Sequence, residues 1–161
     1  MRKILNYAMG DDYSTFTLGH GMDRYDKLKF YLDRCAENLA YVLTISTENY
    51  SPQKLKRGIR GVSGLKAVLR INGALNLVVE GPEEDIISAA DEIFVRTREP
   101  IGIVKYEGGD NMISFGVRLK EALDIARSSP VGRIHLYNPK EDSLPAIIQK
   151  SLAEQQDQAH Q

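Results

Sequence analysis

The sequence has no tryptophan and a single cysteine, Cys35, among its 161 residues. One cysteine cannot form an internal disulfide, and such usage is typical of a protein from a reducing compartment. No apolar run approaches the roughly 18 residues that a membrane-spanning helix needs, and the N-terminus lacks the apolar core of a secretory signal. We therefore expect a cytoplasmic protein without membrane association.

An excess of charge of one sign is also missing. The formal net charge is −1, so no overall field draws the chain towards nucleic acid or membrane. Apolar residues make up 42% of the chain, which suffices for one domain with a core. We expect an N-terminal arm and helix over 1–38, one domain over 39–129, and a C-terminal strand, helix and Gln-rich tail over 130–161.

Constellations typical of enzymes are scarce. His20, His135 and His160 have no metal-ligand spacing and no cysteine nearby in the sequence. Cys35 lies on a predicted helical face, where a small core residue is favoured over a nucleophile. The glycine-rich run at 58–64 leads from helix to strand, whereas a phosphate loop leads from strand to helix. We predict a protein that is not an enzyme and holds no metal.

The centre of the chain predicts a β-hairpin. Two strand-like runs, 65–71 and 74–79, meet at Asn72-Gly73. Asn-Gly is the dipeptide that best tolerates positive φ at both centres of a type I′ turn. The first run alternates with period two, and the second is too apolar to alternate cleanly, as expected of a central strand covered on both faces.

The remaining elements follow from hydrophobic period and from capping signals. Helices are expected at 23–38, 52–60, 82–95, 119–128 and from 143 onward, and strands at 39–46, 101–106, 112–117 and 131–137. This order predicts an α+β fold with a ferredoxin-like β-α-β-β-α-β core, two helices on one face of its sheet. An added fifth strand at 112–117 and helical extensions at both ends complete the prediction.

Four short blocks resemble the BLUF domain, a flavin-binding blue-light sensor built on a ferredoxin-like sheet with an added fifth strand. They are similar to that family's Gly-Ile-Thr-Gly, Leu-Glu-Gly-Pro and Trp-Ser-Met-Gly blocks and to the end of its first strand. The blocks are Ile-Ser at 45–46, Gly-Val-Ser-Gly at 61–64, Val-Glu-Gly-Pro at 79–82 and Ile-Ser-Phe-Gly at 113–116. The resemblance covers about half of the chain.

The resemblance does not extend to the flavin chemistry. The family's photocycle needs a first-strand tyrosine hydrogen-bonded to a third-strand glutamine, and the matching positions here are Thr44 and Leu77. Leucine neither donates nor accepts a hydrogen bond. The matching fifth-strand positions are Ile113 and Phe115. We therefore expect a degenerate member without cofactor, with bound FAD as the alternative.

Charges are unevenly ordered along the middle of the chain. Six cations and no acid lie between residues 50 and 79, and six acids follow from residue 80 to residue 92. The cations are Lys54, Lys56, Arg57, Arg60, Lys66 and Arg70. They suit either a solvated face neutralised by the neighbouring acidic helix or a patch for an acidic partner. No stacking aromatics are interleaved, which disfavours nucleic acid.

The sequence thus favours a non-catalytic interaction or scaffold module that binds an acidic protein surface or joins a larger assembly. Flavin-lacking BLUF-like proteins occur in eukaryotes, including testis-expressed ones, so the resemblance permits a cytoskeletal or ciliary role. Two alternatives stay open: a flavin-binding regulatory or light-sensing domain, and an RNA-associated ferredoxin-like domain.

Overall fold

A computed structural model describes residues 24–48, 52–129 and 133–138. The predicted arm before residue 24 and the predicted helix after residue 142 lie outside these residues. The elements, in chain order, are α3 (Arg24–Leu32), β1 (Ala40–Ile45), α4 (Pro52–Arg60), β2 (Leu65–Ile71), β3 (Ala74–Glu80), α5 (Glu83–Thr97), β4 (Ile101–Tyr106), α6 (Met112–Ser128) and β5 (Ile134–Leu136).

The strands form one mixed sheet in the order β2-β3-β1-β4-β5. Each neighbouring pair among the first four strands of this order is antiparallel, and β5 runs parallel to β4. This order confirms the predicted α+β fold with a ferredoxin-like core and an extra strand. Every residue of β1 is buried, because this strand lies at the centre of the sheet and is covered on both faces.

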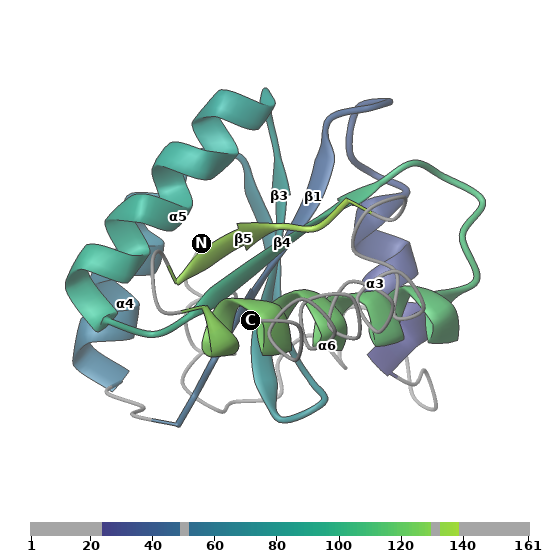
Figure 1. The fold of residues 1–161 in the computed structure, drawn as a ribbon. Helices are drawn as coiled ribbons and strands as arrows, with labels where there is room; N and C mark the ends of the chain where they lie inside the picture. Colours follow the sequence, from purple (N-terminus) through teal and green to yellow (C-terminus); the bar gives the residue numbers. More distant parts are fainter. Residues whose placement is uncertain (1–23, 49–51, 130–132, 139–161) are drawn as a thin grey trace, which may run out of the picture.

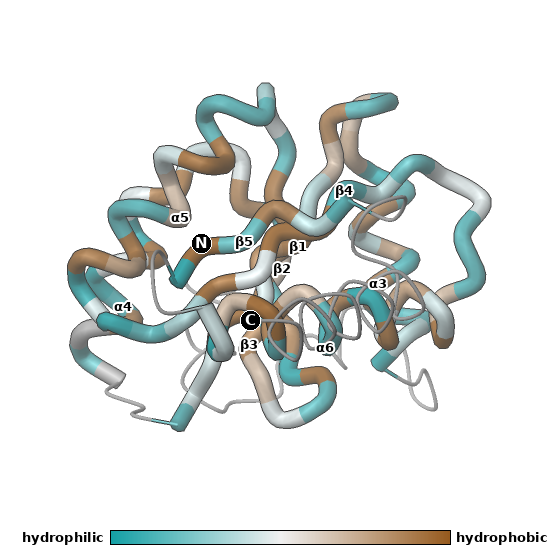
Figure 2. The backbone as a smooth tube through the Cα atoms, in the orientation of Figure 1, coloured by the Kyte–Doolittle hydropathy of each residue, from teal (hydrophilic) through white to brown (hydrophobic). Residues whose placement is uncertain are grey.

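The two core helices expected on one face of the sheet are α4 and α5, and two further helices cover the other face. Figure 1 shows α4 and α5 together on one side and α3 with α6 on the other. On the second side, Gly102 of β4 makes a close approach possible, since a Cβ there would lie 2.7 Å from the backbone of Ala122 in α6. Apolar segments line the sheet and the inner sides of the helices (Figure 2).

The predicted hairpin is confirmed. Asn72 and Gly73 have φ values of 55° and 73°, which is the pair of positive values that a type I′ turn requires. Buried Asn76 stabilises the hairpin, because its amide nitrogen donates to the carbonyls of Leu69, Ile71 and Ala74 at 3.4, 3.2 and 3.1 Å. The turn residues and Asn76, which are close together in the sequence, therefore stabilise the pairing of β2 with β3.

The predicted strand at 112–117 is wrong, because these residues form the first turns of α6. Asn111 caps the helix, and its side-chain oxygen accepts hydrogen bonds from the backbone N–H groups of Ile113 and Ser114 at 3.0 and 3.1 Å. The fifth strand of the sheet is β5 instead. The helix predicted over 23–38 also ends early, at Leu32.

Candidate interaction surface

The positions that match the flavin residues do not meet. In the β1–β3 register Thr44 lies opposite Asn76, and Leu77 lies opposite Leu43. Because neighbouring residues of a strand point to opposite faces, Thr44 faces α6, whereas Leu77 faces α4 and α5. Both are buried, and no hydrogen-bonded pair can form between them.

The two remaining flavin positions lie in α6 rather than in a strand. Phe115 is fully buried, and its ring packs edge-on against Tyr106, with 5.6 Å between ring centroids. Ile113 points the other way and is 65% exposed. Thus Thr44, Leu77, Ile113 and Phe115 do not line a common site, and the placement of the last two in a fifth strand was wrong.

We expect freshly purified protein to lack the blue absorbance band of a bound flavin, before and after FAD is added. Leu77→Gln should not create binding, because Leu43 and not Thr44 faces position 77 across the sheet. Absorbance of the protein peak after gel filtration measures this directly. A flavin band that stays with the protein would contradict the expectation and restore the light-sensing alternative.

The structure divides the six predicted cations into separate groups. Lys56, Arg57 and Arg60 lie in α4, the first half-buried and the two arginines exposed. Lys54 belongs to the same helix, but its side chain lies outside the described part. Lys66 in β2 forms an ion pair with Glu80 at 3.4 Å, so its charge is largely satisfied within the chain.

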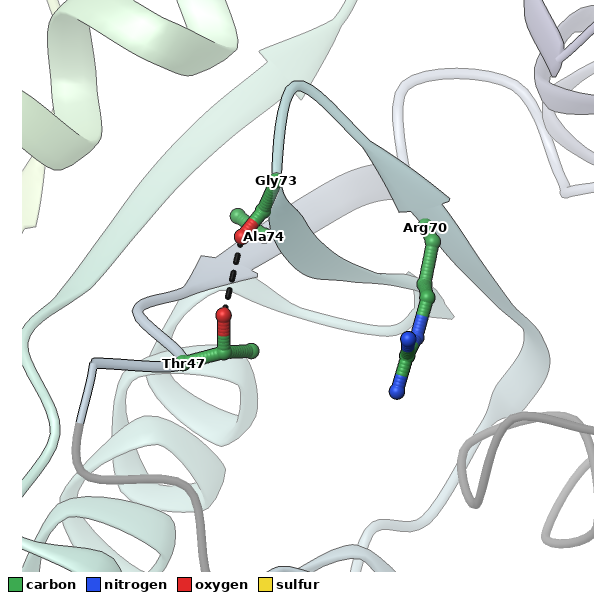
Figure 3. Close-up of a pocket in the computed structure, with 4 residues that line it drawn as sticks. All are labelled: Thr47, Arg70, Gly73 and Ala74. Carbon is green, nitrogen blue, oxygen red and sulfur yellow. Dashed lines mark hydrogen bonds between the residues drawn. The ribbon is translucent and has the colours of Figure 1, made fainter.

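Arg70, at the far end of β2, lines a small pocket beside the hairpin turn (Figure 3). The pocket measures about 200 Å³, and Thr47, Gly73 and Ala74 complete its lining. The Thr47 hydroxyl already donates to the Gly73 carbonyl at 2.9 Å. Arg70 and Lys66 also place charge on β2, an edge strand of the described sheet, where cations discourage unwanted strand pairing.

The helices α4 and α5 pack closely because a glycine faces the contact. A Cβ on Gly58 would lie 3.4 Å from the Ile93 Cα atom. A groove of about 240 Å³ runs between the two helices, which we call the inter-helix groove. It is lined by Gly58, Gly61, Val62, Ser63, Asp85, Ser88, Ala89 and Glu92. Two carboxylates therefore share a groove whose other walls are mostly small residues.

The charges of the two helices are not neutralised by each other. Among the described residues Lys56, Arg57 and Arg60 form no ion pair, and neither do the α5 acids Glu83, Glu84, Asp85, Asp91 and Glu92. Arginines in the last turn of α4 and acids in the first turn of α5 each complement the dipole of their own helix. The predicted neutralisation of α4 by α5 would need ion pairs between the two helices, and none forms among the described residues.

The sequence indicated only the basic half of this surface as a binding site. The cations of α4 were predicted as a binding set, but Asp85 and Glu92 were read only as a charge run. The signal for the groove is the spacing of Gly58, in the last turn of α4, and Gly61, directly after the helix; both leave that side without side chains. Sequence alone does not tell which helix packs against that side.

Two further reactive side chains of the described residues, Cys35 and Tyr106, have structural roles. Burial raises the pKa of the Cys35 thiol, and its Sγ donates to the Tyr31 carbonyl at 3.5 Å, so the nucleophilic thiolate is disfavoured. The Tyr106 hydroxyl donates to Asp33 at 3.1 Å and joins β4 to the chain following α3; burial also raises the pKa of this phenol. Within the same residues no three His, Cys, Asp or Glu side chains gather as a metal site.

Comparison with known proteins gives no relative from which a function could be transferred: no family model, no curated protein and no solved structure matches the sequence. Across the described helices, none combines the length and apolar character needed to cross a membrane.

Proposed function

We propose that this chain is a non-catalytic protein-interaction module that binds an acidic protein surface through the exposed cations of α4. The observation that carries the proposal is that Arg57 and Arg60 form no ion pair within the described chain, although α5 brings carboxylates to the adjacent helix. Exposed unpaired charges add little to stability, but they steer association and select a partner. A cytoskeletal or ciliary assembly is one setting that the BLUF resemblance permits.

The surroundings of these cations favour protein over nucleic acid. The residues of α4 include no aromatic side chain, so the helix offers no platform on which bases could stack. RNA binding is therefore kept as an alternative outcome of the test.

We expect a fluorescent oligoglutamate peptide to bind the full chain at low salt and to dissociate as salt rises. Arg57→Glu combined with Arg60→Glu should weaken this binding about tenfold. The matched control is Lys120→Glu with Arg24→Glu, which changes net charge equally at exposed positions on α6 and α3. Fluorescence anisotropy of the peptide, and of a single-stranded RNA of equal length, measures both interactions.

Equal weakening by the two double variants would mean that only net charge matters and would contradict a site on α4. Tighter binding of the RNA than of the peptide, lost with Arg57→Glu and Arg60→Glu, would replace the protein-partner proposal by the RNA alternative.

A further inference from the structure

The basic and acidic sets of this chain lie side by side on one surface. Arg57 directly precedes Gly58, and Arg60 directly precedes Gly61; both glycines line the inter-helix groove. The acidic residues of the groove, Asp85 and Glu92, belong to α5. Figure 1 shows the two helices running next to each other on the same side of the sheet. A strip of positive charge therefore borders a strip of negative charge.

A surface of this kind is complementary to itself. A two-fold axis between two copies places the basic strip of each on the acidic strip of the other, and every contact occurs twice. A surface with charge of one sign would instead repel a second copy. The charge arrangement is thus complementary to a second copy of the chain.

We propose that two copies of this protein associate through α4 and α5, with Arg57 and Arg60 of one copy bound by Asp85 and Glu92 in the inter-helix groove of the other. This inference rests on the proposed function and names its partner.

The groove has the chemistry to receive an arginine. Its volume is about 240 Å³, and Gly61 and Ala89 leave space beside the carboxylates. The Glu92 carboxylate lies beside the turn that follows α4, since its Oε2 atom is 3.6 Å from the position of a Cβ on Gly61. A planar guanidinium can pair with a carboxylate through two parallel hydrogen bonds, which fixes orientation as well as charge.

An apolar contact is available next to these charges. Val95 follows Glu92 by three residues on α5 and is 63% exposed, and residues three apart on a helix are neighbours on its surface. Burial of Val95 against the second copy would supply apolar area that ion pairs alone do not provide.

The test uses the full chain and a charge exchange, followed by sedimentation equilibrium over a range of protein and salt concentrations. We expect the unaltered chain to dimerise, more weakly as salt rises. Arg57→Glu with Arg60→Glu gives an acidic copy, and Asp85→Lys with Glu92→Lys gives a basic copy. Each alone should dimerise about a hundredfold more weakly, and an equal mixture of the two should restore the dimer as a one-to-one pair.

The control is the Lys120→Glu and Arg24→Glu variant, which has the net charge of the acidic copy but keeps both charged strips, so it should dimerise as the unaltered chain does. Loss of the dimer in this control, or a dimer unaffected by the α4 variant, would overturn the inference. A chain that stays monomeric but binds oligoglutamate through Arg57 and Arg60 would overturn the second copy as partner and leave the proposed function standing. Loss of both interactions would reject both.

Discussion

Replacing Phe115 with alanine is expected to lower the free energy of unfolding by about 3–5 kcal/mol. The Phe115 ring is fully buried between α6 and the sheet, and it meets Tyr106 of β4 nearly at right angles, at 88° between ring planes. Removing the ring deletes this contact and leaves a cavity that the packed surroundings can fill only in part. Urea denaturation followed by circular dichroism measures the loss as a lower midpoint with an unchanged slope.

Ile113→Ala is the control, with an expected change within about 0.5 kcal/mol. The Ile113 side chain is 65% exposed on the opposite side of the same helix. In a strand, residues two apart share a face, whereas in a helix they lie about 200° apart. Similar losses for Phe115 and Ile113 would contradict the helical assignment of these residues and favour the strand that the sequence suggested.

Local signals explain why the hairpin and most elements could be predicted. Asn72-Gly73 specifies its turn through backbone sterics, and of the flanking runs the first alternates and the second is mostly apolar. The predicted bounds of α4, β2 and β4 agree with the structure at both ends. In each of these cases the deciding chemistry lies within a few neighbouring residues, so no knowledge of tertiary contacts is needed.

The start of α6 could not be predicted in the same way because β-propensity depends on context. Met112, Ile113, Phe115 and Val117 form an apolar run that suits a buried strand, but Ile113 and Val117 are exposed and hide the helical period. Asn111 lies directly before this run, and as a favourable helix N-cap it was the residue that could have indicated a helix. Its side chain satisfies two backbone donors that a helix start leaves free.

The alignment between strands that are distant in the sequence was the second feature that could not be predicted. A shift of one residue between β1 and β3 reverses every side chain, and nothing within either strand shows that Leu43 rather than Thr44 lies opposite Leu77. The cations posed the same problem. Lys66 was grouped with Arg57 by sequence distance, yet the pairing of β2 with β3 brings it to Glu80. Which charges remain unpaired is therefore a property of the fold.

Replacing Gly64 with alanine is expected to cost about 3 kcal/mol of unfolding free energy. Gly64 has a φ of 77° and lies where β2 begins, against the end of β3; a Cβ there would lie only 2.0 Å from the Glu80 carbonyl oxygen. The backbone must therefore shift, which breaks the 2.9 Å hydrogen bond from the Glu80 N–H to the Gly64 carbonyl. The left-handed conformation adds its own cost for any residue with a Cβ.

Gly73→Ala separates these two contributions. Gly73 has nearly the same φ, 73°, but a Cβ there would have no neighbour within 4 Å. Its substitution should therefore cost only the conformational term, about 1 kcal/mol. Chemical denaturation of both variants gives the difference, which measures the close approach of β2 to the end of β3. Equal costs at the two positions would show that the chain can relieve the contact at Gly64 without strain, and that sterics do not fix the start of β2.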